Sequence, residues 1–155
     1  MAEGTMRLCR RACTGAVLAL VLGASSCSEK GNPQEQEVRA FLERYFSTWS
    51  ARDMEGYGAS FDPQARISFV SKTGDVQAEG VTDFLHGQKL AHAQAAVPMV
   101  EIPTEMKITF DARVTLASVR WKLTKGAEIV TGADNFTLIK TATGWKIISL
   151  VFYND

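Results

Sequence analysis

Four polar side chains interrupt apolar stretches of this sequence, and their chemical types suit proton transfer or hydrogen bonding to a bound molecule. Tyr45 places a hydroxyl group within an apolar helical stripe, Asp134 interrupts an apolar strand, and Asn154 ends another strand, while His86 falls in a further predicted helix. A carboxyl or imidazole group can act as an acid or a base, and a tyrosine can donate a hydrogen bond to a carbonyl oxygen. Tyr45, Asp134 and His86 are therefore candidate catalytic residues.

Each candidate also has an ordinary structural interpretation. Tyr45 could be a core residue whose hydroxyl bonds to backbone, Asp134 a strand-end or edge carboxylate, and Asn154 an exposed terminal residue. His86 and His92 are the only histidines and lie six residues apart in one predicted helix. That spacing separates them by about 240° around the helix axis, so they cannot share a metal ion. We interpret both histidines as solvated helix residues.

Several classes of function lack their signatures. All three cysteines, the last of them Cys27, lie at the start of the chain, which leaves no thiol in the remaining residues. Beyond Cys27 the chain has 14 basic and 16 acidic residues, a net charge of about −2 that does not favour nucleic acid. No Ser-His-Asp set or glycine-rich phosphate loop occurs. We expect no metal site, no cofactor and no nucleic-acid partner.

Two helices at the start of the domain would position Tyr45. Asn32 and Pro33 supply an N-cap and a proline at the first helical position. The apolar residues that follow recur at helical spacing and form one stripe: Val38, Phe41, Leu42, Tyr45, Phe46 and Trp49. Asp53 can cap a second, short helix, whose core residues we expect to run as far as Phe61.

Strands make up most of the remaining chain. We expect a helix after Gly80 and strands at residues 65–70, 76–79, 106–110, 114–123, 128–140 and 145–153. Gly144 suits the turn between the last two strands, which needs a residue that tolerates positive φ. Alternation predicts two faces for the last strand, one with Trp145, Ile147, Val151 and Tyr153 and the other with Ile148, Leu150, Phe152 and Asn154. We expect Trp145, Val151 and Tyr153 on the face that the first helix leaves uncovered.

This order of elements predicts an α+β domain with helices on one side of a strongly bent sheet. Its motifs include Tyr45 with Trp49, Arg-Asp-Met-Glu-Gly-Tyr at 52–57, Phe-Asp-Pro-Gln-Ala-Arg-Ile at 61–67, and Phe-Thr-Leu-Ile-Lys at 136–140 before Gly-Trp-Lys-Ile. Over residues 35–155 the chain resembles the nuclear transport factor 2-like superfamily. The resemblance implies a cone of strongly curved, mainly antiparallel sheet, with three helices from the N-terminal half on its concave face. It also implies a pocket inside the cone and a homodimer.

Ketosteroid isomerases, which belong to that superfamily, allow a comparison of single residues. Tyr45 stands eight residues before Asp53, as their oxyanion-binding tyrosine does before an aspartate. The position of their catalytic base falls on Phe69, which cannot accept a proton. Their second oxyanion donor falls near Asn135 or Phe136. The resemblance thus implies a pocket that retains one hydrogen-bond donor and lacks the isomerase base.

Three functions of different class follow from these observations. The first is a non-catalytic domain that binds a small, largely apolar ligand in a pocket formed by Tyr45, Phe69, Asp134, Leu150, Phe152 and Asn154. The second is an enzyme similar to SnoaL-like isomerases, cyclases or dehydratases, and the third a homodimeric assembly or partner-binding domain. Trp121 could lie inside the cone or at a dimer surface. Convergence of Tyr45, Asp134 and Asn154 on one cavity would favour the first two.

The N-terminal segment predicts that the protein is located in the bacterial cell envelope. Basic residues and a short apolar run precede Ala24-Ser-Ser-Cys27, which resembles a lipoprotein signal. We interpret residues 1–26 as the signal peptide, 27–34 as a lipidated cysteine with a polar tether, and 35–155 as the folded domain. Ser28 after the cysteine is typical of lipoproteins of the outer membrane that face the periplasm.

The lipid on Cys27 is directly testable. Mass spectrometry of the protein from its own host should show an N-terminal Cys27 that carries diacylglycerol, and Cys27→Ser should leave the precursor unprocessed or release it from the membrane. An unmodified N-terminus, or cleavage at another residue, would contradict the lipoprotein prediction.

Overall fold

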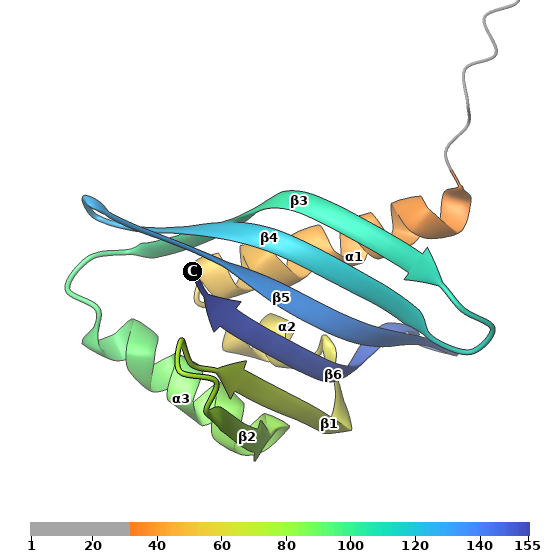
Figure 1. Cartoon of the computed structure of the whole chain (residues 1–155), viewed down its shortest axis with the longest axis horizontal. Coiled ribbons are helices and arrows are strands. Elements are labelled where there is room, and N and C mark those ends of the chain that lie inside the picture. The colour runs from red at the N-terminus through yellow and green to blue at the C-terminus, as the bar shows by residue number, and fades with distance from the viewer. Residues whose placement is uncertain (1–31) are drawn as a thin grey trace, which may run out of the picture.

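The computed structural model describes residues 32–155, so the expected signal peptide and Cys27 lie outside the described residues. The elements in chain order are α1 (Pro33–Ser50), α2 (Met54–Gly58), β1 (Phe61–Val70), β2 (Val76–Gly80), α3 (Val81–Gln94), β3 (Met99–Phe110), β4 (Thr115–Lys125), β5 (Glu128–Thr141) and β6 (Gly144–Asn154) (Figure 1). In this part of the chain, the strands form one sheet in the order β2-β1-β6-β5-β4-β3. The β1–β6 pair is parallel and every other pair is antiparallel.

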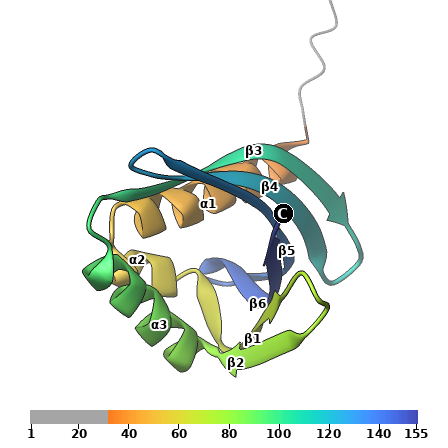
Figure 2. The same cartoon turned by 60° about the vertical axis from the view of Figure 1, so that its left-hand side comes forward.

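The sheet curves strongly, and the helices lie on its concave side. Figure 2 shows the strands as a bent wall from β3 round to β2, with α1 beneath β3 and β4 and with α2 and α3 at the open side. The packing of α1 against β3 and of α3 against β1 closes this space from two directions. The predicted α+β cone is confirmed.

Helix α1 forms as its sequence predicts. The Asn32 side chain accepts a hydrogen bond from the Gln34 backbone N–H at 3.0 Å, and Pro33 follows at the start of the helix. The six residues of the apolar stripe are all buried. Each large apolar side chain removed from water in this way contributes roughly 1.5–3 kcal/mol, which fixes α1 on the sheet.

The second helix is shorter than predicted. Asp53 caps it, and its Oδ1 accepts from the Gly56 N–H at 2.9 Å, but the helix ends at Gly58. Phe61, which we placed in this helix, is instead the first residue of β1. The reason is a backbone bond from the Ile147 N–H to the Ser60 carbonyl at 2.9 Å, which draws the chain onto β6.

A bulge in β6 changes the predicted faces of the last strand. Thr137 pairs with Ser149 and Leu138 with Ile147, so Ile148 is an extra residue opposite β5. An extra residue reverses the alternation beyond it. Trp145 and Ile147 therefore lie in the core, on the same side as Leu150 and Phe152, while Tyr153 is exposed.

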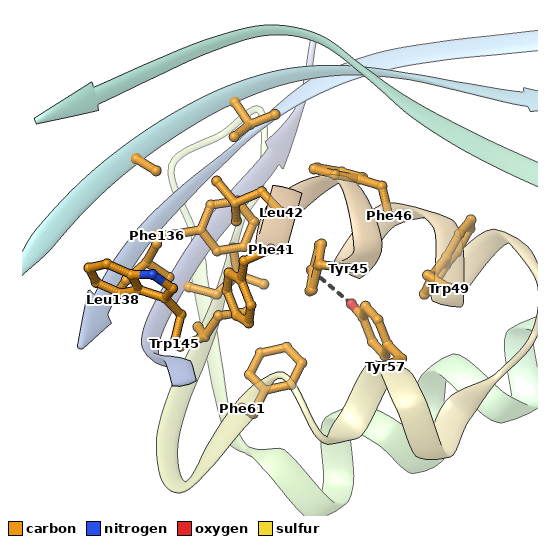
Figure 3. Packing of buried hydrophobic residues seen from close by; sticks show 14 of the residues in the cluster. Phe41, Leu42, Tyr45, Phe46, Trp49, Tyr57, Phe61, Phe136, Leu138 and Trp145 are labelled. Atoms are coloured by element: carbon orange, nitrogen blue, oxygen red, sulfur yellow. Dashed lines mark hydrogen bonds between the residues drawn. The ribbon is translucent and has the colours of Figure 1, made fainter. Parts of the chain in front are cut away.

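The face predicted for Trp145 was accordingly wrong. Figure 3 shows its indole beside Leu138 in the buried cluster, on the helix side of the sheet. The turn that precedes it is as predicted: Thr141 pairs with Gly144, and Gly144 has a φ of 118°.

The close approach of Trp121 to Gly132 gives a stability test. A Cβ at Gly132 would lie 2.2 Å from the Tyr153 carbonyl oxygen and 2.3 Å from the Trp121 ring. Overpacking of this kind costs about 1–3 kcal/mol, so Gly132→Ala should lower the midpoint of urea unfolding. Gly87→Ala is the matched control, because a Cβ there meets no atom within 4 Å and alanine favours a helix. Equal stability of the two variants would show that Gly132 tolerates a side chain.

Candidate functional site

A cavity of about 140 Å³ lies between the concave face of the sheet and the helices. All three helices and strands β3 to β6 contribute to its lining: Tyr45, Trp49, Tyr57, Gln88, Glu101, Trp121, Leu123, Asp134, Leu150, Phe152 and Asn154. An apolar cavity of about this size accommodates benzene in another protein. The enclosed part of this cavity therefore suits one ring or a compound of similar size.

Two tyrosines from different helices form a hydrogen-bonded pair at this cavity. The hydroxyl groups of Tyr45 on α1 and Tyr57 on α2 are 2.8 Å apart, as the dashed line in Figure 3 marks. Burial raises the pKa of both phenols well above the usual range. Both groups are therefore neutral at physiological pH, and they can donate hydrogen bonds but cannot act as bases.

Asp134 is buried on the inner face of β5, with 4% of its surface exposed. Its Oδ1 accepts a hydrogen bond from Trp121 Nε1 at 2.8 Å. Burial raises the pKa of Asp134 to about 7, while hydrogen bonding from Trp121 and Tyr45 opposes this rise. The group thus titrates near neutrality, where an acid–base catalyst works best.

Glu101 brings a second carboxyl group to the same cavity from β3, and the sequence analysis did not identify it. Burial, and after it the charge of Asp134, raises the pKa of Glu101 to about 9. Ser50 fixes the backbone beside it, since its Oγ donates to the Glu101 carbonyl at 3.0 Å and accepts from the Glu101 N–H at 2.9 Å.

The two carboxyl groups can divide the roles of acid and base. Two neighbouring carboxyl groups in a low-dielectric site do not ionise together, so the pair retains a proton over a wide pH range. Asp134 is the member that ionises first, and Glu101 remains protonated. With a tyrosine donor at the same cavity, the site holds a proton acceptor, a proton donor and a neutral hydrogen-bond donor.

Five of the six predicted pocket residues line this cavity: Tyr45, Asp134, Leu150, Phe152 and Asn154. Phe69 does not line it, and its ring packs against Phe152 with 5.3 Å between centroids. Trp121, whose position the sequence left open, is buried inside the cone.

The two histidines differ in their surroundings. His86 is exposed on α3 and does not line the cavity. His92, which we interpreted as solvated, is 4% exposed and packs against Trp49, with ring centroids 4.3 Å apart. The prediction was wrong for His92 because the C-terminal end of α3 comes close to α1.

Residues 32–155 contain no cluster of three or more His, Cys, Asp or Glu side chains that could hold a metal ion. Within the same residues, no helix combines the length and apolar character needed to cross a membrane.

Residues 35–155 match the family described as NTF2-like protein (DUF6841). This chain belongs to that family. The predicted superfamily is therefore confirmed over the same residues that carried the resemblance. No functionally curated protein matches the chain.

Several solved structures share the fold at low sequence identity. A protein of unknown function from Mycobacterium tuberculosis has a TM-score of 0.65 and 23% identity, over 79% of this chain and 72% of its own. An NTF2-like protein of unknown function from Pseudomonas putida has a TM-score of 0.64 and 15% identity, over 77% and 85%. A Streptomyces avermitilis protein of the NTF2-like family, which has been suggested to be a dehydratase, has a TM-score of 0.65 and 14% identity, over 80% and 99%.

The raised pKa of Asp134 predicts how the stability of this NTF2-like domain depends on pH. The folded state binds the Asp134 proton more tightly than the unfolded state. The stabilisation that comes from this proton is complete below pH 3.8 and is lost as pH rises through about 7. The amide in Asp134→Asn has no such proton. As pH rises from 4 to 8, the free energy of unfolding of Asp134→Asn should therefore increase relative to that of the wild type, by up to about 4 kcal/mol.

Urea unfolding at several pH values measures this difference, and Asp111→Asn on an exposed turn is the control. Asp134→Asn also removes the charge that helps to raise the pKa of Glu101, so carboxyl NMR should show a lower pKa for Glu101 in that variant. Parallel pH profiles for Asp134→Asn and wild type would contradict the burial of an ionisable group at this position.

Proposed function

We propose that this protein is an acid–base catalyst of the isomerase or dehydratase type, acting on a small, largely apolar compound with a carbonyl or hydroxyl group. The observation that carries the proposal is the convergence of Asp134, Glu101 and the Tyr45–Tyr57 pair on one cavity. The raised pKa values of both carboxyl groups support it, because perturbed titrating groups concentrate at active sites.

The composition of the cavity walls supports this class of substrate. Leu123, Leu150, Phe152 and the two tryptophan rings supply apolar surface, while the polar groups are few. Such a site binds an apolar body and orients it through one or two oxygen atoms. The volume of about 140 Å³ favours a single ring over a polycyclic compound such as a steroid.

The groups present suit proton transfer next to a carbonyl group. Ionised Asp134 would take a proton from the carbon beside the carbonyl, and a tyrosine hydroxyl would stabilise the enolate oxygen. Protonated Glu101 would return a proton at another carbon, which gives an isomerisation. If Glu101 protonates a hydroxyl leaving group instead, the same removal of a proton from carbon gives a dehydration.

The comparison with ketosteroid isomerases supports the same groups but divides their roles differently, because it places Asp134 at the oxyanion donor. In those enzymes a tyrosine and a protonated carboxylic acid in an apolar site stabilise the oxyanion. Tyr45 and Asp134 are residues of the same types at one cavity. Asp134 precedes Asn135, one of the two positions near which the sequence comparison placed the second oxyanion donor. Phe69 still stands at the base position, so Glu101 on β3 is the further carboxyl group on which such a reaction depends.

Non-catalytic binding of the same class of compound is the second candidate, and Phe69 favours it. We keep the homodimer as a proposal too, with the outer face of the sheet as its surface. Leu116 and Val151 lie there among polar side chains. Two further proposals rest on the sequence alone. They are the lipid anchor on Cys27 and a location at the outer membrane, facing the periplasm.

Deuterium exchange tests proton abstraction without knowledge of the natural product. Small cyclic ketones and their β,γ-unsaturated analogues are incubated with the protein in D₂O, and NMR follows exchange at the carbon beside the carbonyl and movement of the double bond. Asp134→Asn and Glu101→Gln should each slow the exchange about 10²–10⁴-fold. Tyr45→Phe should slow it about 10²-fold or more while both carboxyl groups remain.

Glu105→Gln is the matched control, because Glu105 lies on the same strand as Glu101 but is exposed. Saturable binding without exchange would favour the non-catalytic candidate. Neither binding nor exchange, with every probe, would reject both uses of the cavity.

A further inference from the structure

A second concave site lies outside the cavity, between the α1–α2 turn and the C-terminal half of α3. This groove has a volume of about 370 Å³ and is lined by Arg52, Met54, Lys89, His92 and Ala93. Three of its five lining residues are basic and none is acidic. The groove therefore offers no carboxylate to pair with the positive charges of Arg52 and Lys89.

His92 is the buried member of the groove. Neither of its ring nitrogens has a hydrogen-bond partner among residues 32–155, although both are covered. Buried polar side chains in native proteins almost always have a partner, so two unpaired nitrogens on one ring are exceptional. The packing of the ring against Trp49 explains why it is buried but leaves both nitrogens without a role.

Arg52 and Lys89 supply the exposed positive charges. Neither side chain forms a salt bridge or hydrogen bond to another residue in the described part of the chain. The charge of Arg52 acts on His92, since after burial it is the second cause that lowers the pKa of the imidazole. His92 is therefore neutral at physiological pH, and the groove faces two positive charges, those of Arg52 and Lys89.

The backbone of Arg52 has an uncommon conformation. Its φ of 63° makes it the only non-glycine residue with positive φ in residues 32–155. This conformation ends α1, because it lets the Arg52 N–H bond to the Trp49 carbonyl and the Asp53 N–H bond to the Thr48 carbonyl, both at 2.9 Å. The turn thereby fixes the point beside the groove from which the Arg52 side chain leaves the backbone.

We propose that this groove binds a small oxyanion, a phosphate or carboxylate group, between Arg52 and Lys89, and that the His92 ring turns so that one of its covered nitrogens donates a hydrogen bond to the anion. A guanidinium group presents paired N–H donors that match the oxygens of either anion. A negative charge at this point offsets the like charges of Arg52 and Lys89, and after the ring turns it gives His92 its missing partner. Met54 and Ala93 provide an apolar surface for the carbon part of an organic anion.

NMR of the two histidine rings in the full-length protein tests this site. The protein is titrated with inorganic phosphate and with acetate, each against chloride at matched ionic strength. We expect the ring resonances of His92 to move saturably with at least one of the two oxyanions, while those of His86, on the same helix, follow the chloride control. The stronger response identifies the preferred anion.

Variants of the two exposed basic residues separate binding from folding. Arg52→Gly removes the guanidinium group, and glycine suits the positive φ. The variant should therefore keep the fold and bind the anion about tenfold more weakly. Lys89→Gln should weaken it to a similar extent, and Arg44→Gln, exposed on α1, should leave it unchanged. Equal movement of both histidines, the same response to chloride, or unchanged affinity in Arg52→Gly would overturn the proposal.

Discussion

The burial of the Asp134 carboxyl group beneath Trp121 is the interaction on which the arrangement of the cavity depends. An unpaired carboxylate in such surroundings would be expensive, and the Trp121 Nε1–H supplies one of the few donors within reach. This bond in turn needs the indole to lie close over β5, which the absence of a side chain at Gly132 permits. The positions of Trp121 on β4 and of Gly132 and Asp134 on β5 thus depend on one another. Together they determine the polar end of the cavity.

The shape of the cavity has a different origin, in the irregular part of β6. The extra residue Ile148 lets Ile147 face the core and still brings Leu150, Phe152 and Asn154 to the concave side further along. The parallel pairing of β1 with β6 then carries the sheet round toward α3. Without the bulge, the residues that line the cavity and those that fill the core would lie on opposite faces of the strand.

Much of this architecture follows from local sequence signals. The apolar stripe of α1, the cap at Asn32 and the turn at Gly144 are decided within a few residues, and all three formed as predicted. Asp134 was identifiable as a site residue because a carboxyl group in an apolar strand has to be explained, and Tyr45 because it stands eight residues before Asp53, as in ketosteroid isomerases. Whether they meet at one cavity was left open by the sequence, and the structure places both at the same cavity.

Other features depend on contacts that no local pattern encodes. The strand predicted here began only at residue 106, so Glu101 lay outside it. In the structure, β3 is an edge strand, where proline is tolerated, and it continues through Pro103 to Met99. The burial of His92 arises from the packing of α3 near α1, and the face of Trp145 from one unpaired residue in β6. Each of these depends on how two elements meet.

Trp49 links the cavity to the basic groove. One side of the indole contacts the His92 ring, and its Nε1 donates to Gln88 Oε1 at 2.9 Å, while Trp49 and Gln88 both line the cavity. His92 and Gln88 belong to α3 and Trp49 to α1, so a shift of α3 relative to α1 alters the groove and the cavity wall together. The cavity and the groove therefore share one wall, and the packing of α3 against α1 at this contact shapes both of them.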